Sequence, residues 1–102
     1  MILLPTTFLD YWSTDEPKEG PLLVDPGWFQ LWPPDEIAQL NEDYEVAEYA
    51  PGFLGFGSSG GGEMLAFDQS LRVFMLPFIT MKPEEAILVA LSWDDFLSKV
   101  ER

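Results

Sequence analysis

GFLGFGSSGGGE, which runs from Gly52 to Glu63, contains the spacing Gly-x-Gly-x-x-Gly at residues 55–60. In dinucleotide-binding proteins that spacing opens a helix, whose N-terminal amides bind the phosphates. Here the following residues, EMLAFD, suit a short strand, and no Lys-Ser or Lys-Thr step follows the glycines. Because residues without a Cβ allow positive φ and a tight reversal, the stretch predicts a glycine-rich hairpin turn between two antiparallel strands. The residues assigned to this structural hairpin are Gly57, Gly60, Gly61, Gly62 and Glu63.

Short apolar runs on both sides of the glycines predict further strands. Residues 53–57, 63–68 and 72–76 are expected to form three successive antiparallel strands. Earlier in the chain, residues 22–24 and 28–32 flank the turn signal Asp25-Pro-Gly27 and predict two more. Residues 86–91 form a buried strand or the approach to a helix, because periodicity alone does not separate the two.

Three short helices are predicted around these strands. Apolar residues recur at helical spacing over residues 5–13, and a second helix opens at Pro33-Pro34 and ends before Asn41. A terminal helix starts at Trp93, after a Ser92 that resembles the first residue of a capping box. The expected fold is α+β: one domain over residues 1–102, with a mostly antiparallel central sheet flanked by short helices, including a C-terminal helix.

The composition argues against most catalytic chemistry. The 102 residues include no cysteine and no histidine, which excludes thiolate nucleophiles, zinc sites built on those residues and imidazole bases. We therefore expect a protein that is not an enzyme and that uses no cofactor or metal. The N-terminal residues carry no basic region or cleavage site of a signal peptide, and the longest apolar run is too short to cross a bilayer. A cytoplasmic protein is expected.

Negative charge is concentrated in the first half of the chain. The net charge is -13, and eleven of the eighteen acidic residues lie between Asp10 and Glu48, where Lys18 is the only basic residue. Such a surface repels phosphates, so nucleic acid and anionic membranes are not expected as partners. A basic protein is expected instead, because opposite charge steers association. The predicted contact residues are Asp15, Glu16, Glu19, Glu42, Asp43, Glu45 and Glu48, with Trp28 or Trp32 as an aromatic anchor.

Two acidic clusters also allow other readings. Residues 41–48 could offer oxygen ligands to a hard cation, but they lack the order and the central glycine of a calcium loop, which favours a solvated surface. Asp94 and Asp95 are neighbours on a predicted helix and point in different directions, so capping and helix-dipole roles account for them better than catalysis does. Glu63 is equally well explained by a functional role or by a hydrogen bond that stabilises the turn.

Six motifs follow one another along most of the chain: Leu4-Pro5 with Phe8, LWPPDEI (31–37), YAPGFL (49–54), GSSGGGEMLAFD (57–68), RVFMLP (72–77) and SWDDFL (92–97). In this order they resemble the SUKH superfamily, named for yeast cell-wall-assembly and killer-toxin-resistance regulators, which has many bacterial relatives. Two features depart from the family pattern. No helix precedes the Leu-Pro step in this sequence, and residues 15–20 replace an Asn-Gly-Gly turn, so the edge near the first helix is expected to differ.

The resemblance implies an α+β fold and, for bacterial members, frequent service as immunity proteins that neutralise polymorphic toxins, often nucleases. The function expected from the sequence is therefore a protein-binding module that neutralises a basic toxin domain. Two alternatives stay open: a small-ligand or nucleotide sensor that uses the glycine hairpin, and a regulatory interaction module without a toxin partner. The sequence leaves the oligomeric state undetermined.

Overall fold

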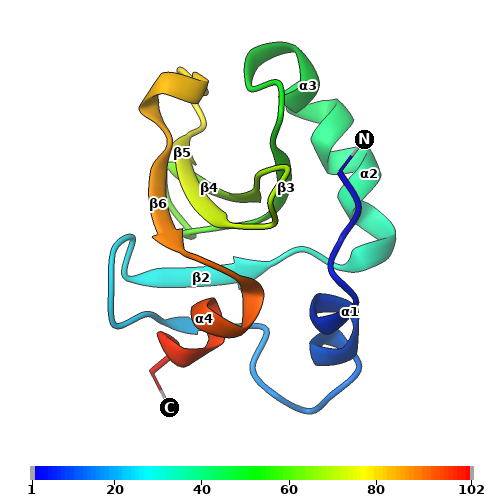
Figure 1. The fold of residues 1–102 in the computed structure, drawn as a ribbon, viewed down its shortest axis with the longest axis vertical. Coiled ribbons are helices and arrows are strands. Elements are labelled where there is room, and N and C mark those ends of the chain that lie inside the picture. Colours follow the sequence, from blue (N-terminus) through cyan, green and yellow to red (C-terminus); the bar gives the residue numbers. More distant parts are fainter. Residues whose placement is uncertain (1, 102) are drawn as a thin grey trace.

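One strongly curled antiparallel sheet organises the molecule (Figure 1). The computed structural model describes residues 2–101, which form a single compact domain of six strands in sequence order, with four α-helices and one 3₁₀ helix. The elements are α1 (Thr6–Trp12), β1 (Glu19–Pro21), β2 (Trp28–Leu31), α2 (Pro34–Asp43), α3 (Val46–Tyr49), β3 (Leu54–Ser58), β4 (Glu63–Phe67), β5 (Val73–Pro77), η1 (Pro83–Glu85), β6 (Ile87–Ala90) and α4 (Trp93–Ser98). The predicted α+β fold with a C-terminal helix is confirmed.

The glycine-rich stretch forms the predicted hairpin turn between β3 and β4. The two strands pair in antiparallel register, with a bulge between Gly55 and Gly57. Both glycines have close neighbours where a Cβ would lie, backbone atoms at Gly57 and side-chain atoms at Gly55. A Cβ on Gly57 would lie 2.4 Å from the backbone oxygen of Gln30 in β2, and a Cβ on Gly55 would lie 2.7 Å from the sulfur of Met64. The glycines thus let β2, β3 and β4 approach one another closely.

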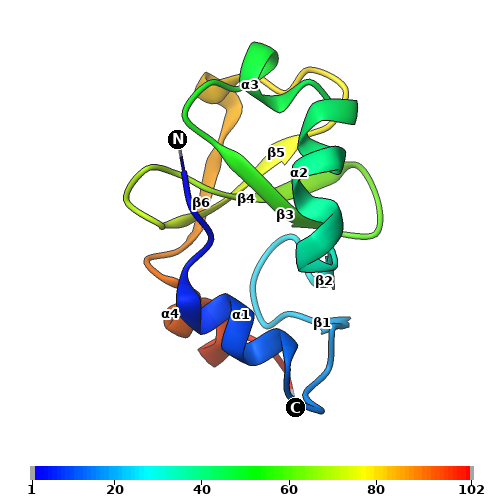
Figure 2. The ribbon, with the colours of Figure 1, turned by 90° about the vertical axis from the view of Figure 1, so that its right-hand side faces the viewer.

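One face of the sheet packs against α1 and α4, which lie together at one end of the molecule (Figure 2). Phe8 of α1 is fully buried, and its ring centroid lies 5.0 Å from that of Trp93 in α4. Phe56 of β3 stacks on Phe67 of β4 at 4.4 Å. Such edge-to-face and stacked rings add to the free energy that comes from burial alone. This aromatic cluster is the larger core.

The other face of the sheet carries a smaller core beneath α3 and the connection that follows β5, whereas Ile37 of α2 belongs to the larger core. Val46 of α3 and Ala50 just after it pack there with Met64 of β4 and Leu76 of β5, and all four are buried. Both faces of the curled sheet are therefore covered, and α2 and α3 are fixed in place by the sheet beneath them. This arrangement positions the surface described below.

The predicted strand at residues 22–24 was wrong. The first strand is β1, at residues 19–21, and Leu22 instead forms an isolated bridge with Val100 near the C-terminus. The Leu23 N–H donates to the Lys99 carbonyl at 2.8 Å. Residues 22–23 therefore pair in part with a chain segment that is distant in the sequence, which a local pattern does not reveal.

The helices between β2 and β3 differ from the expectation, and the segment at residues 86–91 proves to contain a strand. The second helix continues through Asn41 to Asp43, and a further short helix, α3, was not expected. Glu45 separates the two helices in a left-handed conformation, with φ of 55°. The ambiguous segment at 86–91 contains the strand β6. No helix within residues 2–101 is long and apolar enough to cross a membrane.

Candidate protein-binding surface

The predicted acidic contact residues do not form one surface. Asp15, Glu16 and Glu19 lie on the segment that follows α1 and on β1, at the lower end of Figure 1, whereas the other four lie near α3, at the upper end. We call residues 13–19 the acidic loop and residues 42–49 the acidic corner. The long axis of the molecule, 34 Å, separates the two ends. A partner that contacts one group does not need to contact the other.

The acidic corner comprises the end of α2, the turn after it and α3, and it is anchored to the sheet. Val46 is buried in the smaller core, while the four carboxylates of the corner are exposed. Asn41, at the start of the turn, donates from Nδ2 to the Gly55 carbonyl at 2.9 Å and accepts from the Gly55 N–H at 2.8 Å. The corner is therefore held to β3 by side-chain hydrogen bonds as well as by packing. The side chain of Asn41 serves this anchor rather than a cation site.

Two exposed tyrosines lie among these carboxylates. Tyr44 is 43 % exposed and Tyr49 is 53 % exposed. The Tyr44 ring stacks on Trp32 at 5.8 Å between centroids and contacts Phe78 of the loop after β5 at 4.8 Å. Ile79, the next residue of that loop, is 96 % exposed. Exposed aromatic and apolar side chains inside a charged rim are typical of surfaces that bind proteins.

The negative charge of the corner has no local compensation. Within residues 2–101, both ion pairs, Arg72 with Asp68 and Lys99 with Asp95, lie outside the corner. The charge of Glu45, and next that of Glu48, raises the pKa of the Tyr49 hydroxyl above its ordinary value of 10.0. The raised pKa reflects the negative potential at this surface, which a basic partner would relieve.

The acidic loop differs in that a basic side chain lies within it. Lys18 donates from Nζ to the carbonyls of Thr14 and Glu16, each at 2.7 Å. The same ammonium lies 5.3 Å from the centre of the Tyr11 ring. The positive charge is thus folded back onto the loop and offsets part of its negative charge. Of the two acidic groups, the corner presents the stronger uncompensated charge.

The two candidate anchor tryptophans differ in exposure. Trp28 is 40 % exposed and lies against the glycine turn, since its Cδ1 would be 3.2 Å from a Cβ on Gly60. Trp32 is half-buried, packs against both cores and supports Tyr44 from beneath. At the acidic corner the exposed aromatic side chains are therefore Tyr44 and Tyr49, and Trp32 supports Tyr44. The sequence interpretation missed Tyr44 and Tyr49, although tyrosines inside an acidic run are a usable signal for an interface.

Two serines of the glycine turn accept hydrogen bonds from three of the turn's own backbone amides. Ser58 Oγ accepts from the Gly60 N–H at 3.2 Å, and Ser59 Oγ accepts from the N–H groups of Gly61 and Glu63 at 3.2 and 3.3 Å. Ser59 Oγ also donates to the Glu63 carboxylate at 2.8 Å, which is the turn-stabilising bond considered for Glu63. The amides of Gly60, Gly61 and Glu63 therefore already have partners within the turn. In the part of the chain that the structure describes, no group of three or more acidic side chains is placed to hold a metal ion.

No model of a known protein family matches this chain, and no curated protein is similar enough to count as a match. The candidate surface is therefore assigned from its own geometry.

Proposed function

We propose that this chain is a non-enzymatic protein-binding module whose acidic corner binds a basic domain of another protein. The observation that carries the proposal is the combination, on one anchored turn, of four exposed carboxylates without an ion-pair partner and two exposed tyrosines. Carboxylates at a rim speed encounter with a basic partner, while an aromatic group at the centre slows dissociation.

We further propose that the partner is a toxin domain and that the module neutralises it in the cytoplasm. The order of the six motifs along the chain, which resembles that of the SUKH superfamily, supports this proposal, because bacterial members of that superfamily frequently act as immunity proteins. A nuclease toxin has a basic cleft that attracts phosphates, and an acidic corner can occupy or cover such a cleft. Inhibition would then follow from blocking access, without chemistry on the part of this chain.

Co-purification from the native host, followed by identification of the bound protein, tests the proposal. We expect a basic partner whose activity falls to zero at one equivalent of the chain. Its association rate should fall steeply as salt rises, because salt screens exposed charges. An acidic or neutral partner, or an association rate that is independent of salt, would contradict the proposal.

A thermal-shift screen against nucleotides tests the sensor alternative. A ligand present at about a hundredfold excess over its Kd stabilises the folded chain by about 2.7 kcal/mol. We expect no such shift, because three of the turn amides, those of Gly60, Gly61 and Glu63, are already bonded to Ser58 and Ser59. A reproducible shift of that size with any nucleotide would favour a sensor over a protein-binding module.

A further inference from the structure

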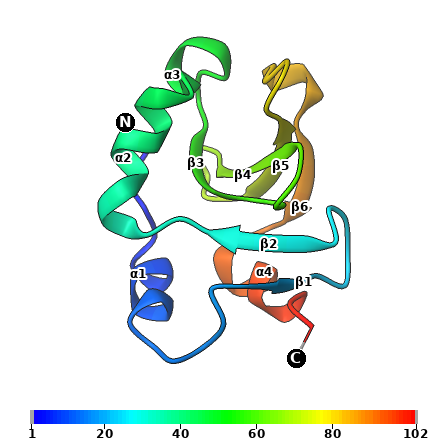
Figure 3. The same cartoon turned by 180° about the vertical axis from the view of Figure 1, so that it is seen from behind.

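The two edges of the sheet differ in whether another chain segment covers them. At the β1 edge, the segment after α4 runs alongside: the Glu101 N–H donates to the Pro21 carbonyl at 3.0 Å, and the Leu23 N–H donates to Lys99. At the opposite edge, β6 pairs with β5 on one side and, among the described residues, with no strand on the other. Figures 1 and 3 show β6 at the outside of the curled sheet. Alternate residues of an antiparallel strand direct their N–H and C=O groups to each side, so β6 offers unpaired backbone groups outward.

The β6 edge lacks most of the features that normally protect an edge strand. Residues 87–91 read Ile-Leu-Val-Ala-Leu, without a charge or a proline. Ile87 is 55 % exposed, Leu88 47 % and Leu91 66 %. One protective feature is present, a register shift in the pairing with β5 between Val73 and Phe74. Such a bulge increases the local twist and opposes long, flat stacking of strands, but it leaves room for one short segment.

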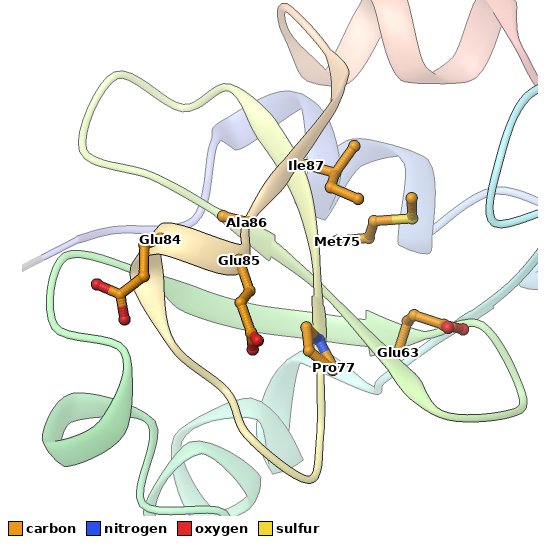
Figure 4. Close-up of a pocket in the computed structure, with 7 residues that line it drawn as sticks. All are labelled: Glu63, Met75, Pro77, Glu84, Glu85, Ala86 and Ile87. Carbon is orange, nitrogen blue, oxygen red and sulfur yellow. The ribbon is translucent and has the colours of Figure 1, made fainter.

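A pocket of about 520 Å³ lies beside this edge (Figure 4). One part of its lining is apolar and is contributed by Met75 and Ile87, which are paired across β5 and β6. The other part is acidic. Figure 4 shows Glu63 and Glu85 on opposite sides of Pro77, with Glu84 pointing outward. Glu63 accepts one hydrogen bond from Ser59, and Glu85 accepts one from Thr80, so each carboxyl group keeps further acceptor capacity.

We propose that the β6 edge is a second binding surface, which takes an extended segment of a partner protein as an added strand and places a Lys or Arg side chain of that segment in the neighbouring pocket. Backbone hydrogen bonds to β6 would supply affinity, as in other cases of strand addition. The pocket would supply specificity, because the aliphatic stem of a basic side chain fits against Met75 and Ile87 while its charged end reaches Glu63 and Glu85. This surface goes beyond the acidic corner, since it uses different residues and a different kind of contact.

A second copy of the chain is a poorer occupant of the edge. The net charge of -13 makes two copies repel each other. Pairing of β6 with β6 would also bring two sets of pocket carboxylates together without any basic side chain between them. The acidic pocket is complementary to a basic segment and not to itself.

Selection from a library of random peptides about ten residues long, enough for one strand, tests the proposal on the intact chain. We expect the enriched peptides to combine β-branched residues with at least one Lys or Arg. Amide chemical-shift changes should be concentrated at residues 73–77 and 84–91. Methylation of alternate backbone nitrogens of the best peptide should abolish binding, because an N-methyl group removes the donors that strand addition requires.

Two variants, each with a matched control, test the acidic pocket and the strand edge separately. Glu85→Lys should weaken binding of the best peptide by roughly tenfold or more, while Glu101→Lys, at the other end of the molecule, changes the net charge equally and should not. Leu88→Lys should weaken binding of the peptide as well. Leu23 is another exposed leucine, and Leu23→Lys should leave binding unchanged. The proposal is overturned if no peptide is enriched, if shifts map to the acidic corner, if the N-methylated peptide binds equally well, or if the chain alone dimerises through β6.

Discussion

Asn41 of α2 and Gly55 of β3 are joined by two hydrogen bonds, one in each direction, between the amide side chain and the glycine backbone. Gly55 is buried, so water does not readily replace Asn41. The same side chain donates to the Ile37 carbonyl one turn earlier in α2. This residue therefore sets the position of the acidic corner relative to the sheet.

Replacing Asn41 by alanine tests the importance of that anchor. Asn41→Ala leaves a buried N–H and C=O of Gly55 without their partner, so we expect a loss of about 1–3 kcal/mol in the free energy of unfolding. Gln39→Ala, on the exposed side of the same helix, is the control and should change stability by no more than about 0.5 kcal/mol. Denaturant titration compares the two variants. Equal stability of both would show that packing alone holds the corner.

A second prediction about stability concerns Gly57, which lies close to the backbone of β2. Gly57→Ala places a Cβ 2.4 Å from the backbone oxygen of Gln30. Backbone has to move to accommodate it, and such overpacking costs about 1–3 kcal/mol. Gly62→Ala meets no atom within 4 Å and should be nearly neutral. Thermal unfolding of the two variants measures the difference, and a Gly57→Ala protein as stable as wild type would refute the close approach of β2 and β3.

Tyr49 reports the potential of the acidic corner. Glu45 is the largest cause of its raised pKa, so Glu45→Gln should lower the pKa of Tyr49 toward 10.0, and Glu48→Gln should lower it less. Ring-proton chemical shifts followed against pH give both values. Because the folded pKa is raised, the contribution of Tyr49 to stability is complete below pH 10 and is lost as pH rises through the folded value. An unchanged pKa of Tyr49 in both variants would contradict the claim that Glu45 and Glu48 create a negative potential at the corner.

Helix α4 depends on its N-cap. Ser92 Oγ accepts from the Asp95 N–H at 3.0 Å, so Ser92→Ala should destabilise the fold by about 1 kcal/mol. Ser70→Ala, in the exposed turn between β4 and β5, serves as the control and should have little effect. Calorimetric unfolding compares them. Similar melting temperatures for the two variants would mean that the packing of Trp93 and Phe96 determines α4 without the cap.

Local sequence patterns were enough to predict the strands around the glycine run and the terminal helix. The strands around the glycine run and the terminal helix were predicted within a residue or two, because turn residues, a cap and apolar alternation all lie inside those segments. The first strand was misplaced, since Leu22 and Leu23 pair with Val100 and Lys99, which lie far away in the sequence. The helix α3 was missed because it depends on Glu45 in a left-handed conformation and on burial of Val46.

The candidate site was predicted only as a set of residue types. Charge counting identified all seven acidic residues, but it treated them as one surface, since nothing in the sequence shows that α3 and β1 lie at opposite ends of the molecule. The support of Tyr44 by Trp32 also required the fold, because the two residues are on different elements. Composition therefore supports only the proposed charge of a partner. The separation of the acidic corner from the acidic loop, on which the proposed binding surface depends, required the structure.

Association kinetics with the partner purified from the native host test the central claim most directly. Glu42→Lys, Glu45→Lys and Glu48→Lys in one protein are matched by Asp15→Lys, Glu16→Lys and Glu19→Lys in another, so both variants change the net charge equally. We predict that the corner variant associates at least about tenfold more slowly at low salt, while the loop variant stays within about threefold of wild type. Equal slowing by the two variants, or slowing by the loop variant alone, would contradict the assignment of the acidic corner as the binding surface.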